Sequence, residues 1–252
     1  MKNLDSSNQQ FLDSLRSERR DLLNRLRQTR FSTLKAGYPQ AQIVPYSSYS
    51  PWLEDHDFIA KYDRVKAFTL VDIYRCYELF ALTRQALRLN GQMVEVGVWR
   101  GGTAALIASS APEKVIHLFD TFEGVAKADV NHDTLYKGGE HADTNVDVVT
   151  GLFGELQLEC QINVGIFPDM TGHKLPSSVA IAHIDVDTYA SAKDSFWAIW
   201  PLVAPRGAIV FDDYGFFGCE GVTRAVDEIR ASISDALFVH NLNGHGLLFK
   251  QA

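Results

Sequence analysis

From residue 91 onward, short apolar runs alternate with stretches of helical periodicity, and this alternation restricts the possible folds more than any other feature. Apolar runs without polar alternation are typical of parallel strands covered by helices on both faces. The turn-forming sequence 241–246 joins the last two runs and favours an antiparallel closing pair. The sequence therefore predicts an α/β fold, a doubly wound and mostly parallel seven-stranded sheet with an antiparallel end. The predicted strands are 92–98, 115–119, 162–167, 179–184, 208–211, 237–239 and 247–249, and the predicted helices between them are 102–110, 146–158, 189–203 and 220–233.

The first 88 residues have a different texture. Apolar residues recur at helical spacing over 9–30 and over 65–89. We therefore expect residues 1–88 to form an N-terminal helical extension and substrate-side cap, followed by a core domain over 89–252. The 9–30 stretch is rich in arginine, and we interpret it as an amphipathic helix that packs on the body or on a partner subunit of a homo-oligomer. A role at a membrane surface or on nucleic acid is the minor alternative.

Composition excludes several function classes. The 252 residues carry a formal net charge of −7, and an acidic chain lacks the clustered basic residues that a general nucleic-acid binder needs. We see no apolar run of about 18 residues that would span a membrane. The N-terminal stretch is polar and resembles no signal peptide, and the cysteines Cys76, Cys160 and Cys219 have no metal-site spacing. We expect a cytoplasmic protein with reduced thiols and a small-molecule acceptor.

A glycine-containing turn follows the first predicted strand, in the sequence VEVGVWRGGT (94–103). Glycines in such a turn allow a ligand to approach the backbone, and the helix that follows offers free N–H groups. Trp99 breaks the dinucleotide pattern G-x-G-x-x-G, so a nicotinamide cofactor is disfavoured. Asp120 ends the second strand, where a carboxylate can accept hydrogen bonds from a ribose diol. A structural turn and a capping aspartate are the alternative interpretations.

Acidic residues gather at the ends of two later strands. HIDVDTY (183–189) ends the fourth predicted strand and FDDY (211–214) ends the fifth. In neighbouring parallel strands these ends share one edge of the sheet, which brings four carboxylates together. Like charges at such a distance repel unless a cation intervenes, and hard oxygen ligands suit Mg²⁺ or Mn²⁺. Asp187 has an alternative role as a helix cap.

Four strings in this order, VEVGVWRGGT, HLFDTFEG, HIDVDTYAS and IVFDDYG, resemble the TylF/MycF family of macrocin-type sugar O-methyltransferases over residues 65–250. The resemblance implies a class I methyltransferase fold, S-adenosylmethionine and Mg²⁺ as cofactors, and methylation of a hydroxyl, such as one of a sugar vicinal diol, on a natural product. It places the metal ligands at Asp185, Asp212 and Asp213. It also implies cofactor contacts from seven residues, namely Glu95, Gly97, Arg100, Gly101, Thr103, Asp120 and Asp185.

Methyl transfer to an aliphatic hydroxyl also needs a base, because such a group is almost never ionised near neutral pH. Asp185 is a candidate as ligand and base together, and His56, Asp57 and His245 are alternatives. The polar, glycine-containing segment 122–147 is predicted to be a lid over cofactor and substrate. Aromatic side chains of an earlier loop are candidates for the wall of the acceptor site, namely Tyr46, Tyr49 and Trp52.

Other functions remain open at this point. Asp185-x-Asp187 also fits a metal-dependent transferase or hydrolase acting on a nucleotide sugar. An O-methyltransferase of a phenolic or other non-sugar acceptor is a second alternative. A scaffold that has lost activity is disfavoured, since four carboxylates held together without a task would cost stability.

Overall fold

In the computed structural model, the described residues are 6–26 and 51–252. The chain divides into two units, residues 1–50 and 51–252. The first unit contains helix α1 (Ser6–Leu26), which exposes Phe11, Leu15 and Leu22. This element agrees with the helix predicted over 9–30, of which residues 27–30 lie outside the described part. None of the helices in the described ranges combines the length and the apolar character needed to cross a bilayer.

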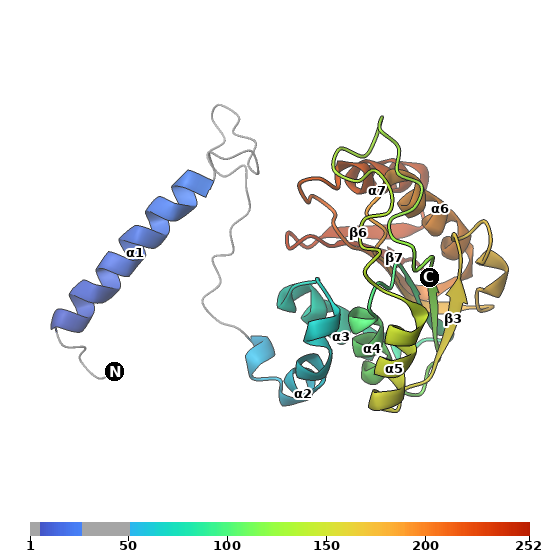
Figure 1. Ribbon diagram of the computed structural model, residues 1–252, viewed down its shortest axis with the longest axis horizontal. Coiled ribbons are helices and arrows are strands. Elements are labelled where there is room, and N and C mark those ends of the chain that lie inside the picture. Colours follow the sequence, from blue (N-terminus) through green and yellow to red (C-terminus); the bar gives the residue numbers. More distant parts are fainter. Residues whose placement is uncertain (1–5, 27–50) are drawn as a thin grey trace. The chain divides into compact units, whose positions relative to one another are not determined.

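The second unit is built on one seven-stranded sheet of order β3-β2-β1-β4-β5-β7-β6 (Figure 1). Strands β1 to β5 pair in parallel, whereas β7 is antiparallel to both β5 and β6. The doubly wound sheet with an antiparallel end is therefore confirmed. The strands are β1 (Gln92–Val96), β2 (Ile116–Asp120), β3 (Cys160–Val164), β4 (Val179–Ile184), β5 (Val203–Phe211), β6 (Ala236–His240) and β7 (Gly246–Lys250).

Helices cover both faces of this sheet, because neighbouring residues of each buried strand point to opposite sides. In β1, Met93 joins the core under helices α2 to α5, and Val94 joins the core under α6 and α7. The helices are α2 (His56–Val65), α3 (Ile73–Ala86), α4 (Gly102–Ser110), α5 (Val146–Leu156), α6 (Tyr189–Ile199) and α7 (Glu220–Ser232), with 3₁₀ turns at Pro51–Leu53, Lys66–Phe68, Gly172–Lys174 and Trp200–Leu202.

The parallel strands end at one edge of the sheet. Val96 of β1 pairs with Phe119 of β2 and with Ile184 of β4, and Ile184 in turn pairs with Phe211 of β5. The residues that follow these positions therefore leave the sheet side by side. This register places the glycine turn and the acidic sequences at the same edge.

The N-terminal part of this unit differs from the prediction. The helix expected over 65–89 is α3, and it begins only at Ile73 because the Asp72 carboxylate caps it by accepting from the backbone N–H groups of Tyr74 and Arg75. Helix α2 was not predicted. Both helices pack in the same core as α4, and the chain divides between Ser50 and Pro51. The boundary expected at residue 88 stays a prediction.

Candidate active site

The turn after β1 depends on a glycine at position 97. Gly97 has a φ of +83°, a region that other residues rarely adopt, and a Cβ on it would lie 1.6 Å from the carbonyl oxygen of Asp185. Its N–H donates to the carbonyl of Phe119 at 2.9 Å. The absence of a side chain thus lets the ends of β1, β2 and β4 meet closely, and the predicted approach of a ligand to this turn stays a prediction.

Asp120 binds this turn from the tip of β2. One carboxylate oxygen accepts from the N–H groups of Val98 at 2.6 Å and Trp99 at 2.9 Å, and the other accepts from Phe122 N–H at 2.7 Å. Asp120 also lines the cavity described below. The carboxylate therefore fixes the turn, which agrees with the alternative interpretation of a capping aspartate, and its role toward a ribose stays a prediction.

Asp185, Asp212 and Asp213 converge at the ends of β4 and β5. Each offers a carboxylate oxygen, and these three atoms lie within 4.8 Å of one another. Burial raises the pKa of Asp185 well above its usual range, and the charges of Asp212 and Asp213 add to this effect. Burial and the charge of Asp212 likewise raise the pKa of Asp213. Such repulsion is relieved by a cation, and three carboxylates form a donor set that fits Mg²⁺ or Mn²⁺.

A cation of the chain itself reaches this cluster. Arg75 of α3 is buried, and its Nη1 lies 2.6 Å from Asp212 Oδ1 and 3.2 Å from Asp213 Oδ1. Burial opposes the charge on Asp212, but contact with His245 and with Arg75 lowers the pKa of Asp212. Sequence reasoning missed Arg75. One signal in the sequence could have indicated it: Arg75 lies among apolar residues of a helix, near Cys76 and Leu79, where a buried charge needs a partner.

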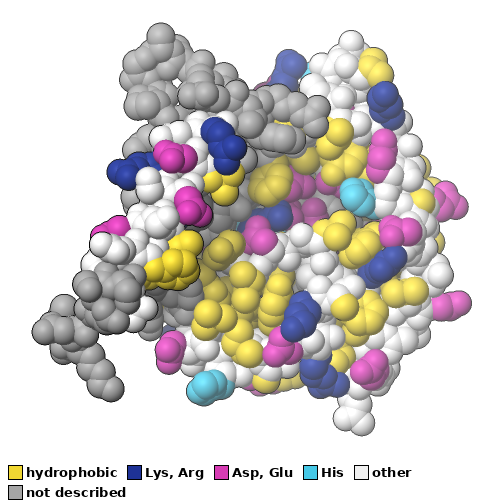
Figure 2. Space-filling model, turned by 60° about the vertical axis from the view of Figure 1, so that its left-hand side comes forward, with side chains coloured by type: hydrophobic (Ala, Val, Ile, Leu, Met, Phe, Trp, Pro, Cys, Tyr) yellow, Lys and Arg dark blue, Asp and Glu magenta, His cyan; other side chains and the backbone are white. Residues whose placement is uncertain are grey.

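These groups border a cavity of about 400 Å³ at the carboxyl edge of the sheet. Figure 2 shows the hollow on this face, where acidic side chains lie beside hydrophobic ones. The volume is within the range of small-molecule sites, and the mixture of apolar walls with a few polar groups is typical of them. The apolar and aromatic lining includes Phe68, Leu70, Phe119, Tyr136, Phe167, Phe216 and Phe217.

Most of the predicted site residues line this cavity, and some do not. The lining includes Gly97, Thr103, Asp120, Asp185, Asp212 and Asp213. Glu95 is fully buried, with Oε1 2.7 Å from Nδ1 of His183, and does not line the cavity. The guanidinium of Arg100 pairs with Asp143 at 2.7 Å and is also outside the lining. The cofactor contacts of both residues stay predictions. Gly101 caps α4 in the left-handed conformation and lies outside the lining.

The candidates for the base lie in different parts of the fold, and most of them do not line the cavity. His56 and Asp57 are exposed on α2, where Asp57 pairs with Lys61, and neither lines the cavity. His245 is fully buried beside Asp212. Of the predicted aromatic wall, Tyr46 and Tyr49 lie outside the described residues. Trp52 packs edge-on against Tyr74 at 5.1 Å and does not line the cavity. The identity of the base therefore stays a prediction.

Segment 122–147 forms one wall of the cavity, through residues such as Tyr136 and Thr144. It is bound to the core at several points. Asp133 is buried and accepts from the backbone N–H of Tyr189 at 2.9 Å, and Lys127 pairs with Asp194 at 2.7 Å. These contacts place the segment where the predicted lid would be, and the motion of a lid stays a prediction.

The sheet order with its antiparallel β7, the glycine turn after β1 and the acid at the tip of β2 together define a class I methyltransferase. Comparison with known proteins gives the family. The chain belongs to the macrocin-O-methyltransferase (TylF) family, whose sequence model matches residues 60–250. The chain is thus an O-methyltransferase of natural-product type, and the alternatives of a nucleotide-sugar hydrolase and an inactive scaffold lose their support.

Two curated relatives are similar over most of their length. A demethyldecarbamoylnovobiocin O-methyltransferase of Streptomyces niveus is 26% identical over 198 residues, which are 71% of this chain and 74% of the relative. An 8-demethyl-8-(2,3-dimethoxy-α-L-rhamnosyl)-tetracenomycin-C 4′-O-methyltransferase of Streptomyces olivaceus is 24% identical over 200 residues, 73% of this chain and 76% of the relative.

Solved structures share the fold. The O-methyltransferase NovP superposes with a TM-score of 0.63 at 22% identity, over 73% of this chain and 83% of NovP. A calicheamicin methyltransferase superposes with a TM-score of 0.58 at 17% identity, over 81% of this chain and 94% of that protein. These likenesses confirm the predicted class I architecture.

Proposed function

We propose that this chain transfers a methyl group from S-adenosylmethionine to a sugar hydroxyl of a natural product, with Mg²⁺ as a required ion. The observation that carries the proposal is the meeting of the Gly97 turn and the Asp185, Asp212 and Asp213 carboxylates in one cavity. The turn and the N-terminus of α4 suit the donor, and the carboxylates suit the ion. The rhamnosyl acceptor of the Streptomyces olivaceus relative supports a glycosylated acceptor.

When bound, the sulfonium supplies an activated methyl group and the divalent ion lowers the pKa of a coordinated hydroxyl. The residues of this chain supply position. Asp120 would hold the ribose, while Gly97 and Thr103 lie where the methionine part would pass. The apolar walls exclude water and orient the acceptor, which brings the attacking oxygen in line with the methyl group.

Asp187 is the carboxylate that we propose as the base. It lines the cavity two residues after Asp185 and is held in the left-handed conformation, with a φ of 61°. Burial and the nearby charge of Asp213 raise the pKa of Asp187 to about 8, which makes it more basic than an exposed aspartate. Asp185, first considered as ligand and base together, remains proposed as a ligand. A carboxylate already bound to a metal ion is a weak base.

The acceptor hydroxyl is proposed to sit on a deoxysugar, where a neighbouring oxygen helps to chelate the ion. The neighbour need not be a free hydroxyl. The acceptor of the tetracenomycin relative carries methoxy groups at positions 2 and 3 of its rhamnosyl group, and that enzyme is a 4′-O-methyltransferase. For this chain we therefore propose a sugar hydroxyl flanked by an oxygen, whether free or methylated.

A methyl-transfer assay tests the proposal. The full chain is incubated with methyl-labelled S-adenosylmethionine, Mg²⁺ and a panel of rhamnosylated aromatic natural products, each with its hydroxyl-blocked counterpart. We expect label in the free-hydroxyl acceptors only, with loss of transfer in EDTA and recovery when Mg²⁺ is returned.

The variant Asp185→Asn should abolish turnover, whereas Asp147→Asn, on the exposed surface of α5, should behave as wild type. Transfer that persists in EDTA, or in Asp185→Asn, would reject the metal part of the proposal. Label in phenolic acceptors alone would reject the sugar.

A further inference from the structure

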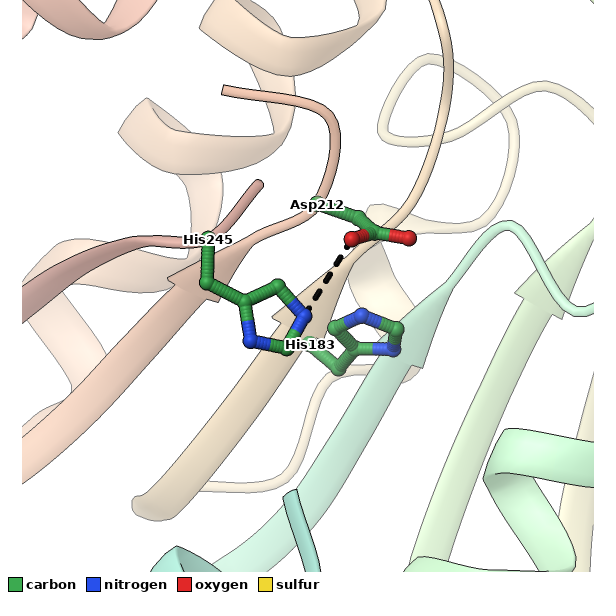
Figure 3. A group of neighbouring side chains, drawn as sticks. All are labelled: His183, Asp212 and His245. Carbon is green, nitrogen blue, oxygen red and sulfur yellow. Dashed lines mark ion pairs between the residues drawn. The ribbon is translucent and has the colours of Figure 1, made fainter. Parts of the chain in front are cut away.

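Two buried histidines lie beneath Asp212, on the side away from the cavity lining. His183 is on β4 and His245 directly precedes β7, and both have no exposed surface. Figure 3 shows the His245 ring directed at the Asp212 carboxylate, with His183 next to it. His245 Nε2 lies 3.2 Å from Asp212 Oδ1. One ligand atom from each of the three side chains falls within 4.8 Å of the others.

Carboxylates fix the orientation of both rings. His183 Nδ1 lies 2.7 Å from Glu95 Oε1, and His245 Nδ1 lies 2.6 Å from Glu78 Oε2. A carboxylate accepts hydrogen bonds, so each Nδ1 carries a proton and Nε2 is the ring nitrogen left to bind an ion. Metal-ligating histidines in proteins are commonly oriented in this way by a carboxylate on the other ring nitrogen.

His183 Nε2 is left without a hydrogen bond. Within residues 6–26 and 51–252 this buried atom has no partner, whereas His245 Nε2 meets Asp212 Oδ1 at 3.2 Å. Buried polar atoms are rarely unpaired, because each loses its hydrogen bonds to water. A metal ion bound between Asp212 and the two rings would pair His183 Nε2 and would take the place of the proton between His245 and Asp212.

The charge around the group also favours a cation. Glu78, Glu95 and Asp212 surround the two rings, and Arg75 is the cation that contacts Asp212. An ion at the histidines would compete with Arg75 for Asp212. Arg75 would keep its other partners, since its Nε lies 2.9 Å from Asp72 and its Nη1 lies 3.2 Å from Asp213.

We propose that His183, His245 and Asp212 form a second metal site, which takes a borderline-soft divalent ion of the Zn²⁺ class. Two imidazoles and one carboxylate suit Zn²⁺ or Co²⁺, with a water as fourth ligand, and are a poor site for Mg²⁺. The site shares Asp212 with the carboxylate cluster. Its occupation draws Asp212 from that cluster, so Zn²⁺ should weaken Mg²⁺ binding without competing for Asp185 or Asp213.

Co²⁺ serves as the probe, because its visible absorption reports coordination number. The metal-free full chain is titrated with Co²⁺ in the presence of Mg²⁺. Because the two sites share Asp212, Mg²⁺ should lower the affinity for Co²⁺ without changing the coordination number that Co²⁺ shows. We expect the intense bands of four-coordinate Co²⁺ at one equivalent and their loss on addition of Zn²⁺. Weak six-coordinate bands that Mg²⁺ suppresses would overturn the proposal.

Variants separate the two sites. His245→Gln should abolish the intense bands, and Glu78→Gln should weaken Co²⁺ binding about tenfold by removing the orienting carboxylate. Asp213→Asn and the exposed-histidine control His173→Gln should retain the bands. Equal loss in Asp213→Asn and His245→Gln would place the ion in the carboxylate cluster instead and contradict the inference.

A measurement on the wild-type chain covers the case in which a variant does not fold. Cu²⁺ bound to the chain in excess Mg²⁺ should show pulsed paramagnetic resonance couplings from the remote nitrogens of two imidazoles. Coupling from no imidazole would overturn the proposal. This readout does not involve methyl transfer, so it stands apart from the outcome of the activity assay.

Discussion

The guanidinium of Arg75 lies 2.6 Å from Asp212 Oδ1, so a side chain of helix α3 neutralises a carboxylate that follows β5. The same nitrogen reaches Asp213 at 3.2 Å. Two of the three proposed metal ligands are thus in contact with an internal cation. Charge in the cluster is balanced by Arg75 on one side, and a divalent ion would balance the carboxylate of Asp185 on the other.

Replacing this cation should make the fold depend on metal. Arg75→Met leaves buried carboxylates without a partner, which costs about 3–5 kcal/mol when a buried pair is broken. Mg²⁺ should then raise the melting temperature of Arg75→Met by more than that of wild type, since an ion that binds only the folded chain stabilises it. Thermal unfolding with and without Mg²⁺ measures both effects.

The matched control is Arg84→Met, because Arg84 is half exposed and stacks at 5.3 Å over Phe80 on the same helix. It should unfold with the Mg²⁺ response of wild type. An Arg75→Met chain with an unchanged Mg²⁺ response would show that Arg75 and the ion do not share the cluster.

Gly97→Ala should destabilise the fold strongly. The added Cβ would meet the Asp185 carbonyl at 1.6 Å in a conformation of positive φ, so the ends of β1 and β4 must separate. We expect a loss of about 3 kcal/mol or more in the free energy of unfolding, from steric and backbone strain together. Urea denaturation measures it. Gly151→Ala, in the exposed part of α5 with no atom in the way, should instead gain roughly 0.5–1 kcal/mol.

Asp120→Asn should impair the fold and the donor site together. The amide retains one acceptor oxygen for three backbone N–H groups, from Val98, Trp99 and Phe122. We expect a loss of about 1–3 kcal/mol in stability for the groups left unpaired. Calorimetry should also show weaker binding of S-adenosylhomocysteine. The control is Asp63→Asn, at an exposed position. If Asp120→Asn binds S-adenosylhomocysteine as tightly as wild type does, Asp120 does not hold the ribose.

Acid should destabilise the fold partly through His117. Burial lowers the pKa of this histidine, an effect that a hydrogen bond with the backbone of Lys174 opposes in part. The unfolded chain therefore binds a proton below about pH 6.5, before the folded chain does, and stability falls as the pH drops from 6.5 toward the lower folded pKa. Unfolding at pH 7.5 and 5.5 should show a smaller decrease for His117→Gln than for the exposed control His173→Gln. Equal decreases would exclude His117.

Much of the fold was predictable because each parallel strand is a buried apolar run. Two places were not. Val65 and Phe68 continue the helical spacing of the residues after 73, which hid the break that Asp72 imposes by capping α3. The first half of β5 contains Pro205 and Gly207, a pattern typical of a turn, and the register with β4 is irregular between Val203 and Ala208 although the strand continues.

The site residues that directly follow a strand could be predicted from the sequence. Asp185, Asp212 and Asp213 come directly after apolar runs, so topology alone brings them together. Arg75 was not accessible in this way, because it meets Asp212 from 137 residues away in the sequence. The pair of Glu95 and His183 had one signal, since these residues are register partners across β1 and β4.

The register pairing of Ile184 with Phe211 determines which residues of β4 and β5 leave the sheet side by side. A slip of one residue between β4 and β5 would turn every side chain of one strand to the opposite face and send Asp212 into the other layer of helices. Insertions and deletions should therefore be tolerated in the loops beyond the strands and not within β4 or β5. A single residue inserted within β4 or β5 would separate the three carboxylates, even though Asp185, Asp212 and Asp213 themselves would be unchanged.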